Sequence, residues 1–275
     1  MNIPNNSVRL ITFNILFDYG DEKAYSWKSR KDRAFSLLRF HAPDIFCLQE
    51  PLQSQVDDFS KHFCEYDFLS AGCEDGISAG QHMSIFFLKE KFTLLESGKF
   101  GLSENPEKLG LVGWDAKNPR LALWTKLSQK STGKVFFIVC THLDHKGENA
   151  RQQGALLLCD RIQKISKEFP VLVCGDFNAN TSSKAYKTMT NCEFLDCANV
   201  QTSINYNQPY SYHKFLLGKG QEEMQKYEDD PRVLKIIDHI FYKGDMEILR
   251  HGILGDNYEG EYPSDHLPKV CDISF

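Results

Sequence analysis

Short apolar stretches rich in β-branched and aromatic residues recur along the whole chain and are typical of β-strands. They cover residues 8–15, 44–48, 83–88, 121–127, 135–143, 171–177, 236–242 and 269–275. Several are apolar on both alternating faces, which indicates strands that are covered on both sides. Two neighbouring pairs are spaced like antiparallel hairpins, namely 83–88 with 92–97 and 121–127 with 135–141.

Helical periodicity separates some of these strands. In residues 148–168, apolar side chains recur at spacings of three and four from Ala155 to Ile165, and charged residues lie outside that stripe. A similar pattern runs from about Ser29 to Phe40, and Pro43 ends it. Interleaved strands and helices with an antiparallel component predict an α/β protein with mixed sheets.

The chain shows no internal repeat, low-complexity tract or Pro/Gly/Ser-rich linker, so we expect one domain over residues 1–275. The region with the least pattern is 201–232, where residues 221–232 carry five acidic and two basic side chains. We expect a solvated loop there, with a mobile lid over a site as the alternative.

Composition limits the function classes. The 275 residues include 32 basic and 37 acidic side chains, a formal net charge of −5, so any phosphate binding must be local. No apolar run is long enough to span a membrane and no signal-peptide pattern opens the chain, so we expect a cytoplasmic protein without stable membrane insertion. Nine cysteines without a C-x-x-C pair fit reduced thiols packed as small apolar side chains.

Candidate chemistry lies at the ends of the apolar strands. A carboxylate there costs desolvation free energy unless it is paired or coordinated, so we expect these groups to converge at one rim. The set comprises Asn14, Glu50, His142, Asp176, Asn178, Asp238, Asp265 and His266. Its oxygen ligands suit Mg²⁺, or Mn²⁺, better than Zn²⁺, and its histidines could protonate or stabilise a phosphoryl group. P-loop and G-x-S-x-G motifs are absent.

The order of these motifs resembles that of the endonuclease/exonuclease/phosphatase superfamily. The matching motifs are TFN ending at Asn14, LQE ending at Glu50, PR ending at Arg120, THL with His142, GDFN with Asp176 and Asn178, IDHIF with Asp238, and SDHLP with Asp265 and His266. The stretch from 114 to 180 is similar to a compact bacterial branch whose substrates are largely unassigned. The resemblance implies a four-layer α/β sandwich, with two mixed β-sheets packed face to face and helices outside.

The resemblance also implies roles at individual positions. Glu50 would be the principal Mg²⁺ ligand, with Asn14 and Asp265 nearby. Asp176 would orient or deprotonate the attacking water, and Asn178 would hold the water and the phosphate. His266, paired with Asp238, would contact a non-bridging phosphate oxygen. His142 would act from the opposite side, and Arg120 would contribute a cationic fork to the phosphate.

Two further positions are weaker candidates for substrate contacts. Asp144 extends the THL motif, where it would contact the substrate or support another site residue, and the alternative for it is a solvent-exposed loop. His213 follows Tyr210 and Tyr212 in a segment that often faces substrate in relatives. Lys214 stands where that branch often has glycine, so this loop could differ.

Three functional hypotheses remain open at this point. The resemblance implies a Mg²⁺-dependent phosphodiesterase, and a nuclease on DNA or RNA is our first hypothesis. Such a nuclease needs a local basic groove, for which the helix with Lys28, Arg30, Lys31 and Arg33 is the candidate; a solvated helix face is the alternative. The second hypothesis is a phosphatase or phosphodiesterase on a small molecule or lipid headgroup, and the third is a non-catalytic binding protein. We expect a monomer.

Overall fold

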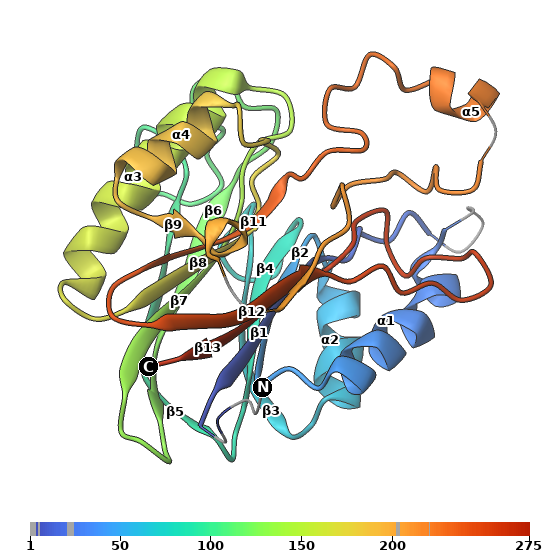
Figure 1. The fold of residues 1–275 in the computed structure, drawn as a ribbon. Coiled ribbons are helices and arrows are strands. Elements are labelled where there is room, and N and C mark those ends of the chain that lie inside the picture. Colours follow the sequence, from blue (N-terminus) through green and yellow to red (C-terminus); the bar gives the residue numbers. More distant parts are fainter. Residues whose placement is uncertain (1–3, 5, 21–24, 202–203, 220) are drawn as a thin grey trace.

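Two mixed β-sheets pack face to face in the computed structural model, which describes residues 4, 6–20, 25–201, 204–219 and 221–275 (Figure 1). Among these residues, the first sheet has seven strands in the order β10-β12-β13-β1-β2-β4-β3, and the second has six in the order β5-β6-β7-β8-β11-β9. Parallel pairs (β1 with β2, β7 with β8) lie beside antiparallel ones.

The strands follow one another along the chain with the following bounds. They are β1 (Val8–Asn14), β2 (Ile45–Gln49), β3 (Tyr66–Gly72), β4 (His82–Leu88), β5 (Phe92–Gly101), β6 (Leu121–Gln129), β7 (Val135–His142), β8 (Val171–Asp176), β9 (Leu195–Asp196), β10 (Ile204–Tyr206), β11 (Asp238–Lys243), β12 (Glu247–Ile253) and β13 (Lys269–Ser274). Their apolar residues form the core between the sheets, where Cys47, Cys140 and Cys174 are buried as free thiols.

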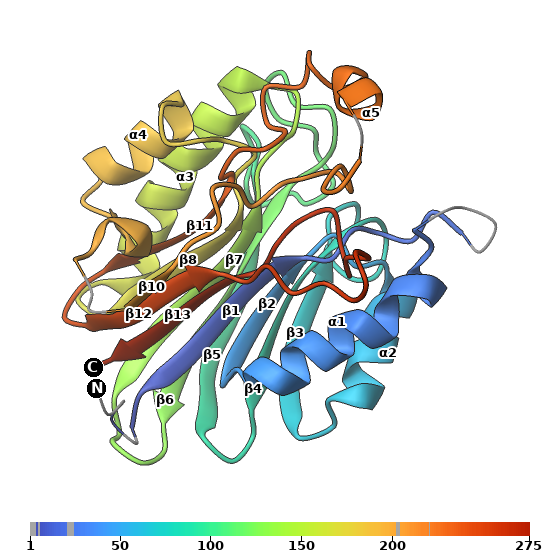
Figure 2. The ribbon, with the colours of Figure 1, turned by 45° about the vertical axis from the view of Figure 1, so that its right-hand side comes forward.

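Helices cover the outer faces of both sheets. Helices α1 (Trp27–His41) and α2 (Gln53–His62) lie on the first sheet, and α3 (Glu148–Ser166) and α4 (Lys184–Asn191) on the second (Figures 1 and 2). Each pair of helices encloses its own apolar cluster against the sheet. The structure thus confirms the expected four-layer α/β sandwich. None of the helices it describes is long and apolar enough to cross a membrane.

The sequence pattern placed the two long helices well. Helix α1 ends where Ala42 adopts a left-handed conformation (φ 44°) and donates its N–H to Leu38 O, directly before Pro43. This is a common way to end a helix, and proline cannot continue it. Helix α3 begins at Glu148, as expected, and ends two residues earlier than the pattern indicated.

One of the two expected hairpins is wrong. Strands β6 and β7 do pair antiparallel, but β4 pairs with β2 and β3, whereas β5 pairs with β6 in the other sheet. The connection 89–91 instead carries the chain from one sheet to the other, and its backbone bonds to both sides, from Lys89 N to Glu65 O and from Lys130 N to Lys91 O. Close spacing in sequence therefore did not mean pairing here.

The region 201–232 is more ordered than the expected solvated loop. It contains β10, which pairs with β12, and the short helix α5 (Gln221–Gln225). Tyr212 forms isolated β-bridges with Lys235 and His266, and residues 211–213 are buried. Figure 2 shows this segment passing over the end of the sheets at which β1 finishes. It therefore brings side chains to that rim.

Candidate active site

Strand register brings the expected polar residues to one rim. In the second sheet, His142 at the end of β7 and Asp238 at the start of β11 both lie opposite Asp176 at the end of β8. In the first sheet, Asn14 ends β1, and Glu50 directly follows the parallel strand β2. The ends of parallel strands in packed sheets meet at the same edge, so both sheets contribute to one centre.

Asp176 lies at the middle of this centre. Its Oδ2 accepts a hydrogen bond from Asn14 Nδ2 of the other sheet (3.0 Å), and its Oδ1 accepts one from the backbone N–H of Asn178 (2.8 Å). The same Oδ2 lies 3.3 Å from His142 Nε2 and 3.7 Å from His266 Nε2. Burial alone would raise the pKa of Asp176, but the flanking imidazoles and the Asn178 N–H hold it well below its usual range.

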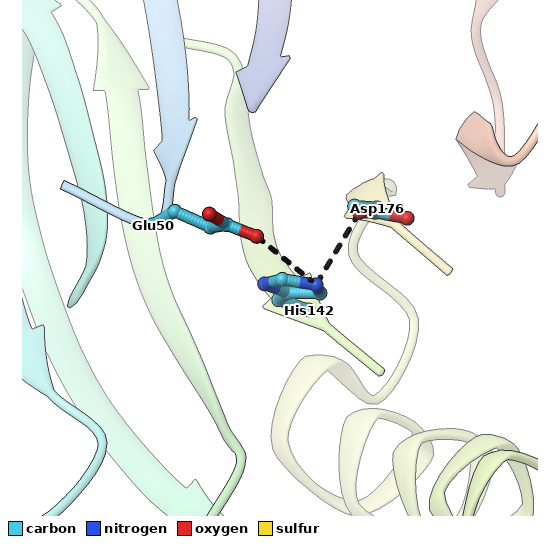
Figure 3. Close-up of side chains that lie close together, drawn as sticks. All are labelled: Glu50, His142 and Asp176. Carbon is cyan, nitrogen blue, oxygen red and sulfur yellow. Dashed lines mark ion pairs between the residues drawn. The ribbon is translucent and has the colours of Figure 1, made fainter. Parts of the chain in front are cut away.

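The centre offers a place for a divalent metal. Figure 3 shows Glu50, His142 and Asp176 facing one another, and one ligand atom of each lies within 4.8 Å of the others. Asn14 Nδ2 is 3.2 Å from Glu50 Oε1, which places an amide beside that carboxylate. A carboxylate-rich donor set of this kind fits a hard cation such as Mg²⁺.

Asp265, the third expected metal ligand, lies deeper than Glu50. Its Oδ1 accepts a hydrogen bond from Ser264 Oγ (3.3 Å), and it lines the same cleft as Glu50. Burial and the nearby negative charge of Glu50 raise the pKa of Asp265, although His266 and Arg30 oppose this. A divalent cation between these carboxylates would relieve their repulsion, so the residues fit the metal that the sequence suggested.

His266 is held as a cation. Its Nδ1 donates to Asp238 Oδ2 (2.9 Å), and that same oxygen accepts from Ser211 Oγ (2.6 Å). Burial disfavours the charged ring, but Asp238, Asp176 and Asp265 outweigh it and raise the pKa of His266 to about 10. An imidazolium therefore points its Nε2–H towards Asp176 and the cleft.

His142 has the opposite kind of partner. Arg120 Nη1 lies 2.9 Å from His142 Nδ1. A guanidinium has only donors, so Nδ1 accepts, while Nε2 faces Asp176 Oδ2 (3.3 Å) and Asn178 Nδ2 (2.9 Å). Arg120 is buried and also reaches Gln81 Oε1 (3.3 Å), so its fork is fixed at the wall of the cleft.

Arg232 is a cleft residue that the sequence analysis missed. Its Nη1 donates to Asn178 Oδ1 (2.7 Å), while its Nε and Nη2 bind both oxygens of Asp230. Its guanidinium carbon also lies 5.5 Å from the ring centroid of Tyr212, which stacks near His266. Arg232 comes from the acidic segment 221–232, whose composition gave no signal for a site residue.

The structure does not support two expected substrate contacts. The side chain of Asp144 is buried, and its oxygens accept the backbone N–H groups of Asn118, Lys146 and Gly147. His213 is fully buried, and its Nδ1 accepts the Phe215 N–H. Neither side chain lines the cleft. Asp144 Oδ2 instead lies 3.7 Å from Nε of the cleft residue Arg120, and the ring of His213 lies 4.6 Å from that of Tyr262.

The basic helix proposed as a nucleic-acid surface is also corrected. Arg30 is 1% exposed and donates to the backbone oxygens of Ile15, Leu16 and Pro263. It therefore joins α1 to the loops that carry the site residues, and it does not present charge to a ligand. Of the remaining basic residues, Lys31 pairs with Asp58 (3.6 Å) and Arg33 with Glu261 (3.8 Å).

The sequence motifs that build this site belong to a known protein family. A family model for the endonuclease/exonuclease/phosphatase family matches residues 11–266, and the chain belongs to that family. This confirms the resemblance that the motifs indicated. Proteins of this class are phosphoric ester hydrolases that generally depend on a divalent metal, and the cluster at Asp176 has the side chains for both properties.

Particular relatives include bacterial family members of known structure and human nocturnin. A solved family member from Bacteroides vulgatus is 35% identical (TM-score 0.88; 98% of this chain and 99% of that chain). A mannosyl-6-phosphatase from Bacteroides thetaiotaomicron is 28% identical (TM-score 0.87; 98% and 100%). Human nocturnin is 27% identical over 288 residues, and the match covers 92% of this chain and 59% of nocturnin. The chain thus spans about three fifths of that curated relative.

Proposed function

We propose that this protein is a Mg²⁺-dependent hydrolase of phosphate esters whose substrate is about the size of one nucleotide or sugar phosphate. The observation that supports this best is the cleft over Asp176, which has a volume of ≈320 Å³. That volume lies at the small end of ligand sites. Arg120, Arg232 and the His266 imidazolium converge on it, and they suit the charge of a single phosphoryl group.

In this proposal Glu50 holds the metal, with Asn14 beside it and Asp265 close by. The metal, when bound, neutralises charge on the phosphate and lowers the pKa of a water. Asp176 accepts a hydrogen bond from the attacking water and orients it; its depressed pKa favours orientation over net proton uptake. His266 donates from Nε2 to a non-bridging oxygen, and Asp238 stabilises its charge.

His142 presents Nε2 to Asp176 Oδ2 (3.3 Å), while Arg120 holds the ring through Nδ1 (2.9 Å). Asn178 is held by the Leu143 carbonyl (2.9 Å) and by Arg232, so its amide has one orientation. Catalysis in such a site comes mainly from positioning and from preorganised charge.

An exonuclease that removes one terminal nucleotide is the second candidate function. The similarity to nocturnin and to Ccr4 exoribonuclease subunits of fungi favours it. A nuclease that binds a longer stretch of DNA or RNA along the basic helix has weaker support, because the central arginine of that helix, Arg30, is buried.

Hydrolysis of a substrate panel by the purified protein tests the proposal. The panel contains sugar phosphates, nucleoside monophosphates, bis(p-nitrophenyl) phosphate, and single-stranded RNA and DNA, each with Mg²⁺, Mn²⁺ or EDTA. We expect turnover of small esters with metal and none with EDTA. Asp176→Ala is the control for contaminating activity, and an equal rate in that variant would contradict the assignment.

Cleavage pattern separates the two candidate functions. Release of inorganic phosphate from monoesters without shortening of RNA supports the phosphatase. Stepwise release of nucleoside monophosphates from one end of RNA supports the exonuclease, and internal cuts contradict both.

A further inference from the structure

A second cavity adjoins the catalytic cleft. It has a volume of ≈530 Å³ and shares three lining residues with the cleft, namely His145, Asn178 and Arg232. The remaining walls come from the loop before α3 and its first turn, the residues that follow β8, the start of α4 and the segment between β10 and β11. A molecule bound in the cleft can therefore extend into this cavity past Arg232.

The lining of this cavity is basic in a chain that is acidic as a whole. Six lysine or arginine residues line it against three acidic residues, whereas the whole chain has a formal net charge of −5. Two of those acids already have partners, because Asp230 binds Arg232 and Glu148 lies 3.6 Å from Lys184. Lys226 is also paired, with Glu223 outside the cavity lining, so the positive charge left for a ligand comes from Lys146, Arg151 and Lys214.

Two of the lysines have no carboxylate partner. Among the described residues, no acidic group lies within ion-pair distance of Lys146 or Lys214, and the Lys214 ammonium lies 4.3 Å from the ring centroid of Tyr227. They approach from different elements, before α3 and after β10. Lysines that line one cavity and have no carboxylate to neutralise them are suited to binding an anion.

Helix α4 adds to this field. It begins at Lys184 with Ser183 as its N-cap, and both residues together with Ala185 line the cavity. Ser183 Oγ accepts the Tyr186 N–H (3.1 Å), and the first helical residues Lys184 and Ala185 lie at the cavity wall. A helix N-terminus favours phosphate, and here it accompanies the lysines rather than acting alone.

We propose that this cavity is a second phosphate subsite, so that the preferred substrate carries another phosphate group beyond the scissile one. The inference rests on the proposed function and makes it more specific. Arg232 lies at the junction, where it binds Asn178 on the catalytic side and faces the second cavity on the other. It therefore couples the two ends of one bisphosphorylated substrate.

Paired substrates test the subsite. One pair is thymidine 5′-(p-nitrophenyl phosphate) with and without a 3′-phosphate, read by p-nitrophenol release. The other is glucose 1,6-bisphosphate and glucose 6-phosphate, read by ³¹P NMR at the 6-position. Because a charge-assisted contact is worth roughly 1.5–3 kcal/mol, we expect kcat/KM to be about tenfold or more higher for the bisphosphate of at least one pair. The pair in which the bisphosphate has the higher kcat/KM shows whether the second phosphate is carried by a nucleotide or by a sugar.

Charge-neutral variants assign the effect to the cavity. In the triple variant Lys146→Gln/Lys184→Gln/Lys214→Gln, we expect the ratio of kcat/KM between bisphosphate and monophosphate to fall about tenfold. Lys187→Gln is the matched control, because Lys187 is exposed on α4 but does not line the cavity. Equal kcat/KM within both pairs, or an unchanged ratio in the triple variant, would overturn the proposal.

A binding measurement keeps this result separate from the proposed function. Calorimetric titration of the wild-type protein in EDTA compares adenosine 3′,5′-bisphosphate with adenosine 5′-monophosphate. Tighter binding of the bisphosphate that the triple variant loses supports the subsite even if no ester is hydrolysed, in which case only the catalytic assignment fails. Equal affinity for the two nucleotides overturns the subsite.

Discussion

His142 and His266 flank the same carboxylate oxygen of Asp176, yet their far ring nitrogens face opposite charges. His142 Nδ1 faces the Arg120 guanidinium (2.9 Å), and His266 Nδ1 faces the Asp238 carboxylate (2.9 Å). The first contact requires a neutral ring and the second favours a cation. Two identical side chains in one cleft therefore carry different charges.

The group that contacts Nδ1 of each histidine, more than the position of the ring in the cleft, therefore sets the protonation of that ring. Both rings are buried and both Nε2 atoms point at Asp176. With one cationic and one neutral ring, the cleft can bind a phosphate anion without placing two positively charged rings close to Arg120 and Arg232.

The largest effect is expected from His266→Gln. Glutamine can still donate a hydrogen bond, but it removes the positive charge that faces the phosphate. We expect kcat to fall about 10³-fold, as for loss of a preorganised electrostatic donor. Steady-state kinetics with a small ester measures this, and near-normal turnover by the folded variant would contradict a catalytic role for the imidazolium.

Asp238→Asn should lower the rate less and change its pH dependence. The active imidazolium exists below its pKa, so wild-type activity should fall on the alkaline side only as the pH approaches about 10. Without the carboxylate, burial dominates and that limb should move towards neutral pH, with a rate loss of about 10²-fold at pH 8.

Asp196→Asn is the matched control for that shift. Asp196 pairs with His239 Nδ1 (3.1 Å) in a similar buried contact that does not line the cleft. In Asp196→Asn, the alkaline limb of the pH–rate profile should stay at the wild-type pH when the rate is divided by the amount of folded protein. A limb that moves equally in both variants would show that Asp238 has no specific influence on the reacting imidazolium.

Arg120→Gln tests the neutral side of the contrast. It removes the donor that keeps His142 Nδ1 unprotonated, and it removes one cation from the cleft. We expect kcat/KM to fall about tenfold to a hundredfold, the usual cost of losing a charge-assisted contact. Arg120→Lys should recover only part of this, because it restores charge without the fork. ¹⁵N NMR of the imidazoles reports the tautomer, and an unchanged tautomer in Arg120→Gln would contradict the role given to the arginine.

The smallest effect concerns a third histidine, His213, which has no hydrogen-bond partner on Nε2 among the described residues. Burial and the positive charge of His266 lower its pKa to about 3. The unfolded chain binds a proton near pH 6.5 and the folded one does not, so this group lowers the free energy of unfolding as pH falls from about 6.5 towards 3. The contribution to the slope is at most about 1.4 kcal/mol per pH unit.

His213→Gln should flatten that part of the stability profile. Urea denaturation at a series of pH values measures the slope for both proteins. The same slope in wild type and variant would mean that other groups cause the acid sensitivity.

The sequence predicted the layers of the fold and most of the rim because both depend on local pattern. Buried strands such as β2 and β8 are short apolar runs, and the polar residues that follow them, Glu50 and Asp176, are visible in the sequence for that reason. The strand pairing of β4 and β5 was not predictable in this way, because sheet membership depends on distant partners.

The errors and omissions at the site have a common physical cause. Arg232 reaches the cleft through a segment without periodicity, so its position depends on the tertiary contact with Asn178. Arg30 looked like an exposed basic residue because its acceptors are backbone carbonyls from three loop positions, which no side-chain pattern reveals. Side-chain type alone therefore located the chemistry at strand ends but not the groups that support it.

The place of β13 in the first sheet has a consequence for the life of the nascent chain. Strand β13 lies between β12 and β1, so the first strand gains its second neighbour only after residues 269–274 have left the ribosome. Until then the edge of β1 that will pair with β13 remains open. Ribosomes that stall just before residue 269 would therefore display an inactive chain with an open sheet edge that a chaperone could bind.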